Sequence, residues 1–417
     1  MSKALRVKIH RGAHEVGGTC IEVESSESRI VLDVGRPLDA LRDDFVPLPD
    51  VNGLRDLAPS LLGLIISHGH QDHWGLIEQV AKNVPVYIGE SGHRILKEAA
   101  FLSSGVRFDP AGFLRHRESL ALGPFTITPF LNDHSAFDTY SMLIEADGRR
   151  LFYSADLQAH GRKAGIFEEF VRKPPTRVDV LLMEGTNLRH QGDPKSGKTE
   201  HEVEKDLIQT FTATPGIVLA MYSAQNIDRL VTMFRACIQA GRHLVLDLYA
   251  ASIAAATANP NIPKAGFEKL LVYVPLRQRI QVKESGEFER VASIKAVRIF
   301  SEELAARAQE LVLSFRTSMM SEIEGARCLS DASAVWSMWP GYLELPGQHR
   351  LLSFFERHGI PLYTHHASGH AYVSDLHRLA TAIAPGRLVP IHTFAADRFG
   401  EFFENVELHR DREWWVV

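Results

Sequence analysis

Four side chains that can bind metal ions occur within six residues, in a stretch at 65–75 that reads Ile-Ile-Ser-His-Gly-His-Gln-Asp-His-Trp-Gly. They are His68, His70, Asp72 and His73. Imidazole and carboxylate groups together suit zinc, or manganese where the site is rich in oxygen. His68 and His70 alternate along extended backbone and can point toward one metal, while Asp72 and His73 lie further round a turn and can serve a second. A polar loop that is rich in histidine by chance would have no physical reason for this ligand density.

The elements that must hold this stretch follow from the pattern around it. The apolar run at 61–66 predicts a buried strand, and residues 75–84 have helical character. The four side chains would then lie on a loop at the carboxyl end of a strand, where α/β sheets place their sites. Two more site candidates follow predicted strands: residues 132–135 (Asn-Asp-His-Ser) and residues 154–156 (Ser-Ala-Asp).

Length and composition favour a soluble globular protein of two or three domains. The chain has 417 residues, of which 45% are hydrophobic and 23% charged, with a formal net charge of −5. This charge argues against a protein coated in nucleic acid but allows a local basic groove. The three cysteines, Cys20, Cys237 and Cys328, are widely spaced, which predicts buried thiols and no disulfide framework. Neither a membrane span nor an apolar signal core is predicted, so a cytoplasmic location is expected.

The string His-x-His-x-Asp-His at 68–73 resembles the signature of the metallo-β-lactamase superfamily. The resemblance implies an α/β fold of four layers, αββα, with further ligands at later strand ends. It implies that His134 completes the ligand set of His68 and His70, that Asp156 bridges two metals, and that Asp33 orients a ligand histidine from behind.

Later residues narrow this resemblance to the β-CASP branch of the superfamily, whose members are nucleases. The matching features are Glu-Gly-Thr after the strand that ends on Glu184, His-Ala-Ser-Gly-His at 366–370, Pro-Ile-His at 390–392, and strand–helix alternation after residue 199. Ser135-x-x-Asp138 and Asn226-x-x-Arg229 fit ribonuclease J in particular. The likeness implies that Glu184, His370 and His392 are motif residues, and that His392 joins Asp72, His73 and Asp156 at the second metal.

The domain organisation follows from the same likeness. Residues 1–190 are expected to form the first part of the metallo-β-lactamase domain, residues 191–355 an inserted Rossmann-like α/β (β-CASP) domain, and residues 356–417 the remainder of the first domain. The sequence departs from ribonuclease J at 314–320, where a Gly-Ser-Gln-Gly-type segment is usual. It also ends soon after His392, so a short form without the further C-terminal domain is expected.

The predicted function is a phosphodiesterase that uses two divalent metal ions, with zinc or manganese as the alternatives. The likeness points to single-stranded RNA as the substrate. Asp72, Asp156, Glu184 and His370 are the predicted catalytic residues, with His370 as the proton donor or, alternatively, only a cap of the following helix. The residues predicted to contact substrate are Asn226, Arg229, His366 and Ser368. A homodimer is possible. Exonuclease and endonuclease action are both compatible with the sequence.

Three other function classes must be weighed against a ribonuclease. A DNA nuclease of the β-CASP type and a non-nuclease hydrolase of the same fold would use the same metal ligands. Residues 192–199 match the P-loop pattern of nucleotide triphosphatases, but no strand leads directly into them. A capping box formed by Thr199 and Glu202 explains the end of that segment more simply.

Overall fold

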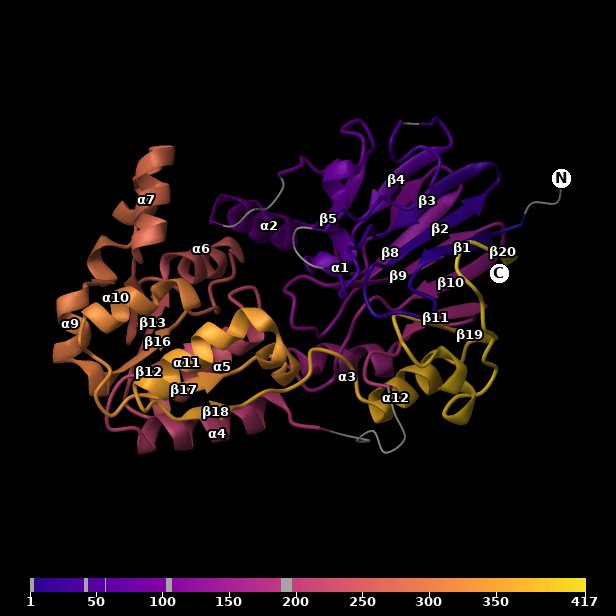
Figure 1. The fold of residues 1–417 in the computed structure, drawn as a ribbon. Coiled ribbons are helices and arrows are strands. Elements are labelled where there is room, and N and C mark those ends of the chain that lie inside the picture. Colours follow the sequence, from indigo (N-terminus) through magenta and orange to yellow (C-terminus); the bar gives the residue numbers. More distant parts are fainter. Residues whose placement is uncertain (1–3, 41–43, 57, 103–106, 189–196) are drawn as a thin grey trace. The chain divides into compact units, whose positions relative to one another are not determined.

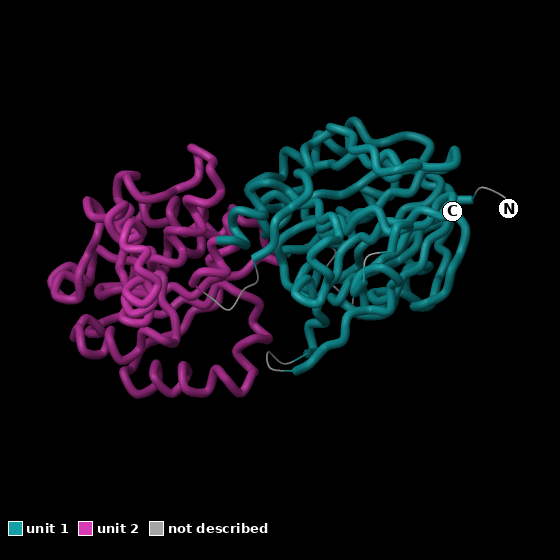
Figure 2. The backbone as a smooth tube through the Cα atoms, turned by 90° about the horizontal axis from the view of Figure 1, so that it is seen from above, with its two compact units in different colours: residues 1–97, 106–197, 369–417 teal, residues 98–105, 198–368 magenta. Residues whose placement is uncertain are grey.

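The computed structural model describes residues 4–40, 44–56, 58–102, 107–188 and 197–417. The chain divides into two compact units, which Figure 2 distinguishes by colour. Unit 1 comprises residues 1–97, 106–197 and 369–417, and unit 2 comprises residues 98–105 and 198–368. The chain therefore returns to unit 1 after it has completed unit 2.

Unit 1 is built on two β-sheets (Figure 1). The first sheet has the strand order β20-β1-β2-β3-β4-β5-β6, and the second has the order β19-β11-β10-β9-β8-β7. The strands of the first sheet are β1 (Arg6–Arg11), β2 (Cys20–Ser25), β3 (Ser28–Leu32), β4 (Leu61–Ile65), β5 (Val86–Gly89), β6 (Gly112–Leu114) and β20 (Trp414–Val416). Those of the second are β7 (Leu120–Leu122), β8 (Phe125–Leu131), β9 (Tyr140–Ala146), β10 (Arg149–Tyr153), β11 (Val180–Glu184) and β19 (Arg387–Ile391).

The two sheets of unit 1 share one apolar core. Val7 and Ile9 alternate with polar residues along β1, so both reach the same face and join a cluster with Ile144 and Leu182 of the second sheet. The outer face of the second sheet is covered by α3 (Ala164–Arg172) and α12 (Val373–Ile383). The outer face of the first sheet is covered by α1 (Gln71–Trp74), by α2 (Glu90–Leu102) and by the chain around residues 46–54. The predicted four-layer αββα fold is thus confirmed.

Unit 2 carries an additional sheet in which every neighbouring pair of strands is parallel. Its strand order is β15-β14-β13-β16-β12-β17-β18. The strands are β12 (Val218–Met221), β13 (His243–Asp247), β14 (Leu270–Tyr273), β15 (Arg298–Ile299), β16 (Leu311–Ser314), β17 (Ser333–Trp336) and β18 (Leu362–Thr364). This arrangement is consistent with the expected β-CASP-like insertion.

Helices connect the parallel strands of unit 2, as crossovers between parallel neighbours require. They are α5 (Ile227–Gln239), α6 (Leu248–Ala256), α7 (Leu276–Ser285), α8 (Glu289–Ala292), α9 (Ser301–Ala306), α10 (Met320–Gly325) and α11 (His349–Arg357). The helix α4 (Glu200–Ala213) leads into the first of these strands, β12. The 3-10 helices of the chain are η1 (Ile77–Gln79), η2 (Lys295–Val297), η3 (Ala308–Glu310), η4 (Thr317–Met319), η5 (Pro340–Glu344), η6 (Pro346–Gln348) and η7 (Ala396–Glu401). No helix among the described residues is long and apolar enough to cross a membrane.

The helix predicted at 75–84 is wrong. The α-helix there is α1, which ends at Trp74, and only the short η1 follows it. The reason is tertiary: Leu76 is buried, and its backbone N–H donates to the carbonyl of Val34 at 3.0 Å instead of continuing the helix. Asp72 and His73 consequently lie within the helical turn of α1 and not on a loop before it.

A buried charged cluster ties β1, β2 and β3 together. Glu22 accepts from Arg29 Nη1 at 2.6 Å and lies 2.7 Å from His10 Nε2. The side chains of Glu22 and Arg29 are 4% and 9% exposed. Burial alone would raise the pKa of Glu22, but its bonds to His10 and Arg29 outweigh burial and hold the pKa below the usual value.

We therefore expect Glu22→Gln to destabilise unit 1 at neutral pH by about 3–5 kcal/mol, because it leaves the charge of Arg29 buried without a carboxylate partner. The folded-state pKa of Glu22 is depressed, so its stabilisation is complete above the ordinary glutamate pKa, about 4.3. It is lost as the pH falls through the lower folded-state value. Denaturant unfolding of the wild type and of Glu22→Gln at several pH values should show that the difference in their free energies of unfolding decreases as the pH falls.

Glu24 provides a matched control on the same strand. Its ion pair with Arg6 has side-chain exposures of 26% and 40%, so Glu24→Gln should cost less than about 1 kcal/mol. Equal losses in the two variants would contradict the role assigned to the buried cluster.

Candidate metal centre

The strand β4 delivers the first histidines of the site. Just past its end, the backbone N–H of Ile66 donates to the carbonyl of Tyr87 at 2.8 Å, and His68 and His70 then precede the helix α1. The next turn of chain, in α1, carries Asp72 and His73. Trp74 anchors this turn, because its indole N–H donates to the carbonyl of Gly69 at 3.0 Å.

Three strands of the second sheet bring further side chains to the same place. His134 follows β8, Asp156 follows β10 and His392 follows β19. Two of these strand ends use left-handed backbone, with φ of +48° at Ala155 and +49° at His392. Such conformations are uncommon for residues other than glycine, and here they turn the chain at the end of the sheet where the site lies.

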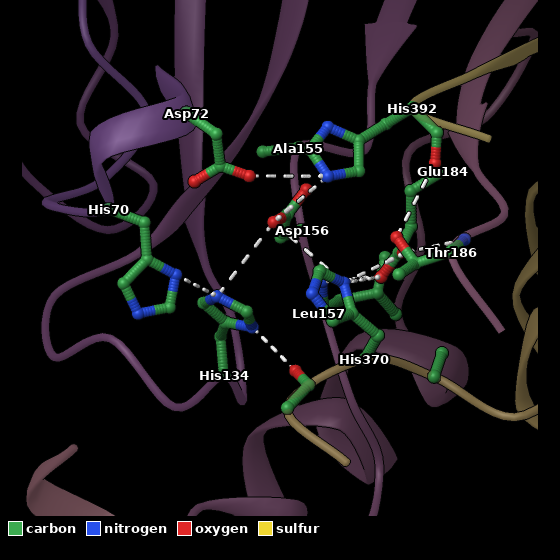
Figure 3. A network of polar contacts seen from close by, with 12 residues as sticks. His70, Asp72, His134, Ala155, Asp156, Leu157, Glu184, Thr186, His370 and His392 are labelled. Atoms are coloured by element: carbon green, nitrogen blue, oxygen red, sulfur yellow. Dashed lines mark hydrogen bonds and ion pairs between the residues drawn. The ribbon is translucent and has the colours of Figure 1, made fainter. Parts of the chain in front are cut away.

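The first ligand group consists of His68, His70, His134 and Asp156, whose candidate ligand atoms all lie within 4.8 Å of one another. Figure 3 shows His70, His134 and Asp156 of this group. His70 Nδ1 lies 3.1 Å from His134 Nε2. The Nε2 atoms of His68 and His134 lie 3.7 and 3.9 Å from Asp156 Oδ2. Three imidazoles and one carboxylate thus face a common point, which is a donor set that suits zinc.

The second group consists of Asp72, His73, His392 and again Asp156. The Nε2 atoms of His73 and His392 lie 3.2 and 3.8 Å from Asp156 Oδ2. Asp72 Oδ2 lies 3.5 Å from His392 Nε2 and 3.9 Å from His73 Nε2. Because Asp156 belongs to both groups, the two sets of ligands adjoin, as in sites that hold a pair of metal ions.

The buried polar atoms of these groups fit metal ions. His68 Nε2, His73 Nε2, His392 Nε2 and both carboxylate oxygens of Asp156 are buried without a hydrogen-bond partner. Burial of polar atoms without partners is costly, and a carboxylate is the most expensive case. Divalent cations would satisfy all five atoms at once.

The remaining ring nitrogens of the ligand histidines are held by other groups. His73 Nδ1 lies 2.8 Å from Asp33 Oδ2, and His392 Nδ1 lies 2.9 Å from Thr19 Oγ1. His134 Nδ1 donates to the carbonyl of Gly369 at 2.6 Å. These contacts direct the opposite nitrogen of each ring into the site, which is the usual arrangement around ligating histidines.

Asp33 links several of these supports. Its carboxylate also accepts from the backbone N–H of Ser67 at 2.7 Å, from Ser67 Oγ at 2.7 Å and from the hydroxyl of Tyr153 at 2.6 Å. Ser67 Oγ in turn lies 3.0 Å from His68 Nδ1. Sequence reasoning identified Asp33 but missed Thr19, Ser67 and Tyr153, because an isolated hydroxyl residue beside a strand end carries no signal of its own.

The electrostatics of the site favour the protonation states that bind metal. Burial and the neighbouring imidazoles of His73 and His134 hold the pKa of His68 well below its usual value. Burial would raise the pKa of Asp156, but His392 and His73 lower it far more. Neutral imidazole and ionised carboxylate are the ligand forms that coordinate cations. His73 is the exception: burial lowers its pKa, whereas Asp156 and Asp33 raise it well above the usual value.

His370 and Glu184 form a pair at the edge of the ligand groups. His370 Nδ1 lies 3.1 Å from Glu184 Oε2 and 3.8 Å from Asp156 Oδ2 (Figure 3). Glu184 is fully buried and also accepts from the backbone N–H groups of Leu157 and Thr186, at 3.1 and 3.2 Å. Burial lowers the pKa of His370, but Glu184 and Asp156 outweigh it and raise the value to about 9.

His370 does not cap the following helix. The N-cap residue of α12 is Tyr372, whose side chain makes no capping hydrogen bond. Asp156, Glu184 and His370 could themselves form a third group of ligands, so metal content must be measured in any variant of His370.

The structure gives two of the predicted substrate-binding residues another role within unit 2. Asn226 is the N-cap of α5, where Oδ1 accepts from the backbone N–H of Arg229 at 2.8 Å. The guanidinium of Arg229 is fully buried and donates to Glu200 at 2.6 Å and to Ser337 Oγ at 2.6 Å. Arg229 is thus committed to the interior of unit 2, whereas Asn226 is half-buried and its contact with substrate stays a prediction. His366 and Ser368 are partly buried in the segment that leads to His370, and their role stays a prediction.

Most of the segment that matches the P-loop pattern lies outside the described residues, which exclude 189–196. Its end is described: the predicted capping box of Thr199 and Glu202 is confirmed, at the start of α4. Lys198, the lysine of the pattern, pairs with Asp206.

Comparisons with known proteins agree with this geometry. A family model described as a β-lactamase superfamily domain matches residues 30–233. A solved structure of a protein of unknown function from Enterococcus faecalis V583 superposes with a TM-score of 0.78 and 21% identity, over 99% of this chain and 100% of that one. The chain therefore has a metallo-β-lactamase fold, and residues 30–233 match the β-lactamase superfamily domain.

A more distant similarity links the chain to ribonuclease J. The ribonuclease J of Mycobacterium tuberculosis is 23% identical over 416 residues, which cover 94% of this chain and 69% of the relative. The ribonuclease J of Synechocystis sp. is 26% identical over 247 residues, which cover 55% of this chain and 37% of the relative.

We expect the purified protein to bind about two divalent ions per chain, because seven ligands exceed the needs of one tetrahedral site. Asp156→Ala should lower the metal content below that of the wild type, since this carboxylate belongs to both groups. Elemental analysis, together with the shift in melting temperature on metal addition, measures this without reference to activity. The exposed Asp50 offers a control, and Asp50→Asn should keep the wild-type metal content. A wild type that saturates with one ion would rule out the paired site.

Proposed function

We propose that this protein is a metal-dependent phosphodiesterase that cleaves single-stranded RNA in the manner of a ribonuclease J. Seven candidate ligands, six of them buried, meet the His370–Glu184 pair in one unit, and this supports a hydrolase most directly. The similarity to ribonuclease J over 94% of the chain supports RNA as the substrate. A DNA nuclease or an ester hydrolase of the same fold remains the alternative that experiment must separate.

His68, His70 and His134 would hold one metal ion, Asp72, His73 and His392 would hold the other, and Asp156 would contact both. Five of these seven ligands are imidazoles, so zinc is the expected metal, with manganese as the alternative. Bound divalent ions would supply positive charge for the attacked phosphate and activate water at neutral pH. The protein's own part is to hold the ligand rings in place through Asp33, Thr19 and the carbonyl of Gly369.

His370 would donate a proton to the leaving oxygen. Cleavage of a phosphodiester produces an alkoxide, which leaves readily only when it is protonated or otherwise stabilised. Glu184 lies against Nδ1 and orients the ring at the edge of the ligand groups. The same carboxylate raises the pKa of His370, so the ring carries its proton at neutral pH.

The preference for a single strand follows from the depth of the site. The side chains of Asp72, His73, Asp156 and His392 are at most 10% exposed, so the scissile phosphate must approach a recessed surface. A flexible single strand can bend toward such a surface more easily than a stiff duplex.

The decisive assay compares matched 5′-labelled RNA and DNA, single-stranded and duplex, with 5′-monophosphate or 5′-hydroxyl ends. We expect metal-dependent cleavage of single-stranded RNA to exceed that of the other substrates. The ladder of products then separates exonuclease from endonuclease action. Cleavage of DNA with intact RNA would replace this proposal with the DNA-nuclease alternative, and hydrolysis of simple esters alone would exclude a nuclease.

We expect His370→Ala to slow the chemical step by ~10²–10⁴-fold with unchanged metal content. A nitrophenyl phosphodiester, whose leaving group needs no proton, should restore most of the lost rate. The substitution acts on proton donation only if this rescue occurs. If the variant loses a metal ion or stays equally slow on the activated ester, His370 is a ligand or a binding residue.

The pH profile provides a separate test of Glu184. A general acid must be protonated, so activity should fall as the pH rises through the pKa of His370, which Glu184 raises. Glu184→Gln removes that contribution, and the high-pH limb of the profile should therefore move to lower pH. If the high-pH limb of Glu184→Gln stays at the wild-type position, a group other than His370 determines that limb.

A further inference from the structure

A pocket lined by three arginines opens on unit 1 at a distance from the metal centre. It has a volume of about 370 Å³. Its lining residues are Arg149, Arg177, Val178, Asp179, Gly386 and Arg387. They come from the starts of three strands that lie side by side in the second sheet, β10, β11 and β19 (Figure 1).

The pocket and the metal centre lie at opposite ends of these strands. β10, β11 and β19 run parallel, and each is five residues long. Asp156, Glu184 and His392 follow or end the strands, whereas the arginines stand at or before their first residues. At a rise of about 3.3 Å per residue, the two ends are separated by roughly 16 Å. A ligand in the pocket would therefore not touch the metal ligands.

The charges that line the pocket are unbalanced. Three guanidinium groups face one carboxylate, and both oxygens of Asp179 are occupied: Oδ1 accepts from Arg149 Nη1 at 2.9 Å and Oδ2 from the backbone N–H of Arg150 at 2.8 Å. Arg387 pairs with Glu407, outside the lining, at 3.0 Å. Arg177 is exposed and has no hydrogen-bond or ion-pair partner among the residues that the structure describes.

The backbone around the pocket is arranged at some cost. Arg177 has φ of +54°, a left-handed conformation that is unfavourable for a bulky residue. Gly386 allows a close approach of β19 to the segment before β11, because a Cβ atom there would lie 3.0 Å from the carbonyl oxygen of Asp179. Where three chain segments meet, the unpaired guanidinium of Arg177 thus lies beside two paired ones, and an anion there would give it a charge-assisted partner.

We propose that this pocket binds a ligand through a phosphate group. Guanidinium groups form paired, charge-assisted hydrogen bonds with phosphate oxygens, and arginine suits this geometry better than lysine. The volume exceeds that of one phosphate ion and lies in the range of small-molecule sites, so a phosphate ester is the fitting class. The phosphate comes either from a free ester or from a nucleic-acid backbone, and the second source rests on the proposed nuclease function.

The test is calorimetric titration of the full chain with inorganic phosphate and with a short single-stranded RNA, at fixed ionic strength. Each titration is done on the protein as purified and again after chelation, so that the metal centre neither binds phosphate nor cleaves RNA. We expect phosphate binding to survive chelation. Arg177→Gln should weaken phosphate binding at least about 10-fold, because a charge-assisted bond is lost. The affinity of Arg177→Lys should lie between those of the wild type and Arg177→Gln.

Two further variants guard against misreading. Arg149→Gln, at a side chain that is 54% exposed, should also weaken phosphate binding, which keeps the test valid even if Arg177→Gln affects folding. Arg115→Gln, at a side chain of the same unit that is 61% exposed, should bind phosphate as the wild type does.

The outcomes separate the two ligand sources and the two proposals. If RNA competes with phosphate and this competition is lost in Arg177→Gln, the nucleic-acid backbone is supported as the source of the phosphate group. Phosphate binding without competition supports a free ester. No saturable phosphate binding after chelation, or binding that neither pocket variant weakens, overturns the proposal. Because no step of this test depends on catalysis, its failure and the failure of the nuclease assignment are distinguishable.

Discussion

The carboxylate of Asp156 is buried among five imidazoles, each with a ring nitrogen within 3.9 Å of its Oδ2 atom. Neither of its oxygens has a hydrogen-bond donor. An isolated buried carboxylate would be prohibitively unstable, so this arrangement makes sense only with positive charge at its centre. The other features of unit 1 follow from the need to hold these rings in place around one carboxylate.

The two packed sheets supply that rigidity. Ligands come from the ends of β4, β8, β10 and β19, so the site draws on both sheets of the core. Behind the ligands, Asp33 joins His73, Ser67 and Tyr153 in a buried network. Such a network fixes the ring orientation before any metal binds, which lowers the cost of assembling the site. At the opposite ends of β10 and β19, and of β11 between them, Arg149, Arg177 and Arg387 come together.

Unit 2 shows how a resemblance can identify a residue and still misjudge its role. Arg229 matches the pattern of a nuclease motif, yet its guanidinium is buried against Glu200 and Ser337. A basic side chain in a nucleic-acid enzyme suggests phosphate contact, but sequence does not show how much of it is covered. The helix predicted at 75–84 failed for a related reason, because a bond from Leu76 to Val34 replaced a helical one.

The sequence by itself determined what depends on neighbours along the chain. The buried strand before His68, the ligand types at 68–73, the capping box at Thr199 and the parallel insert all follow from local spacing and period. Only the tertiary structure decided which distant groups support the site. Thr19 meets His392 across 373 positions, and Tyr153 meets Asp33 across 120. Such pairs leave no local pattern, because their contacts are created when the sheets pack.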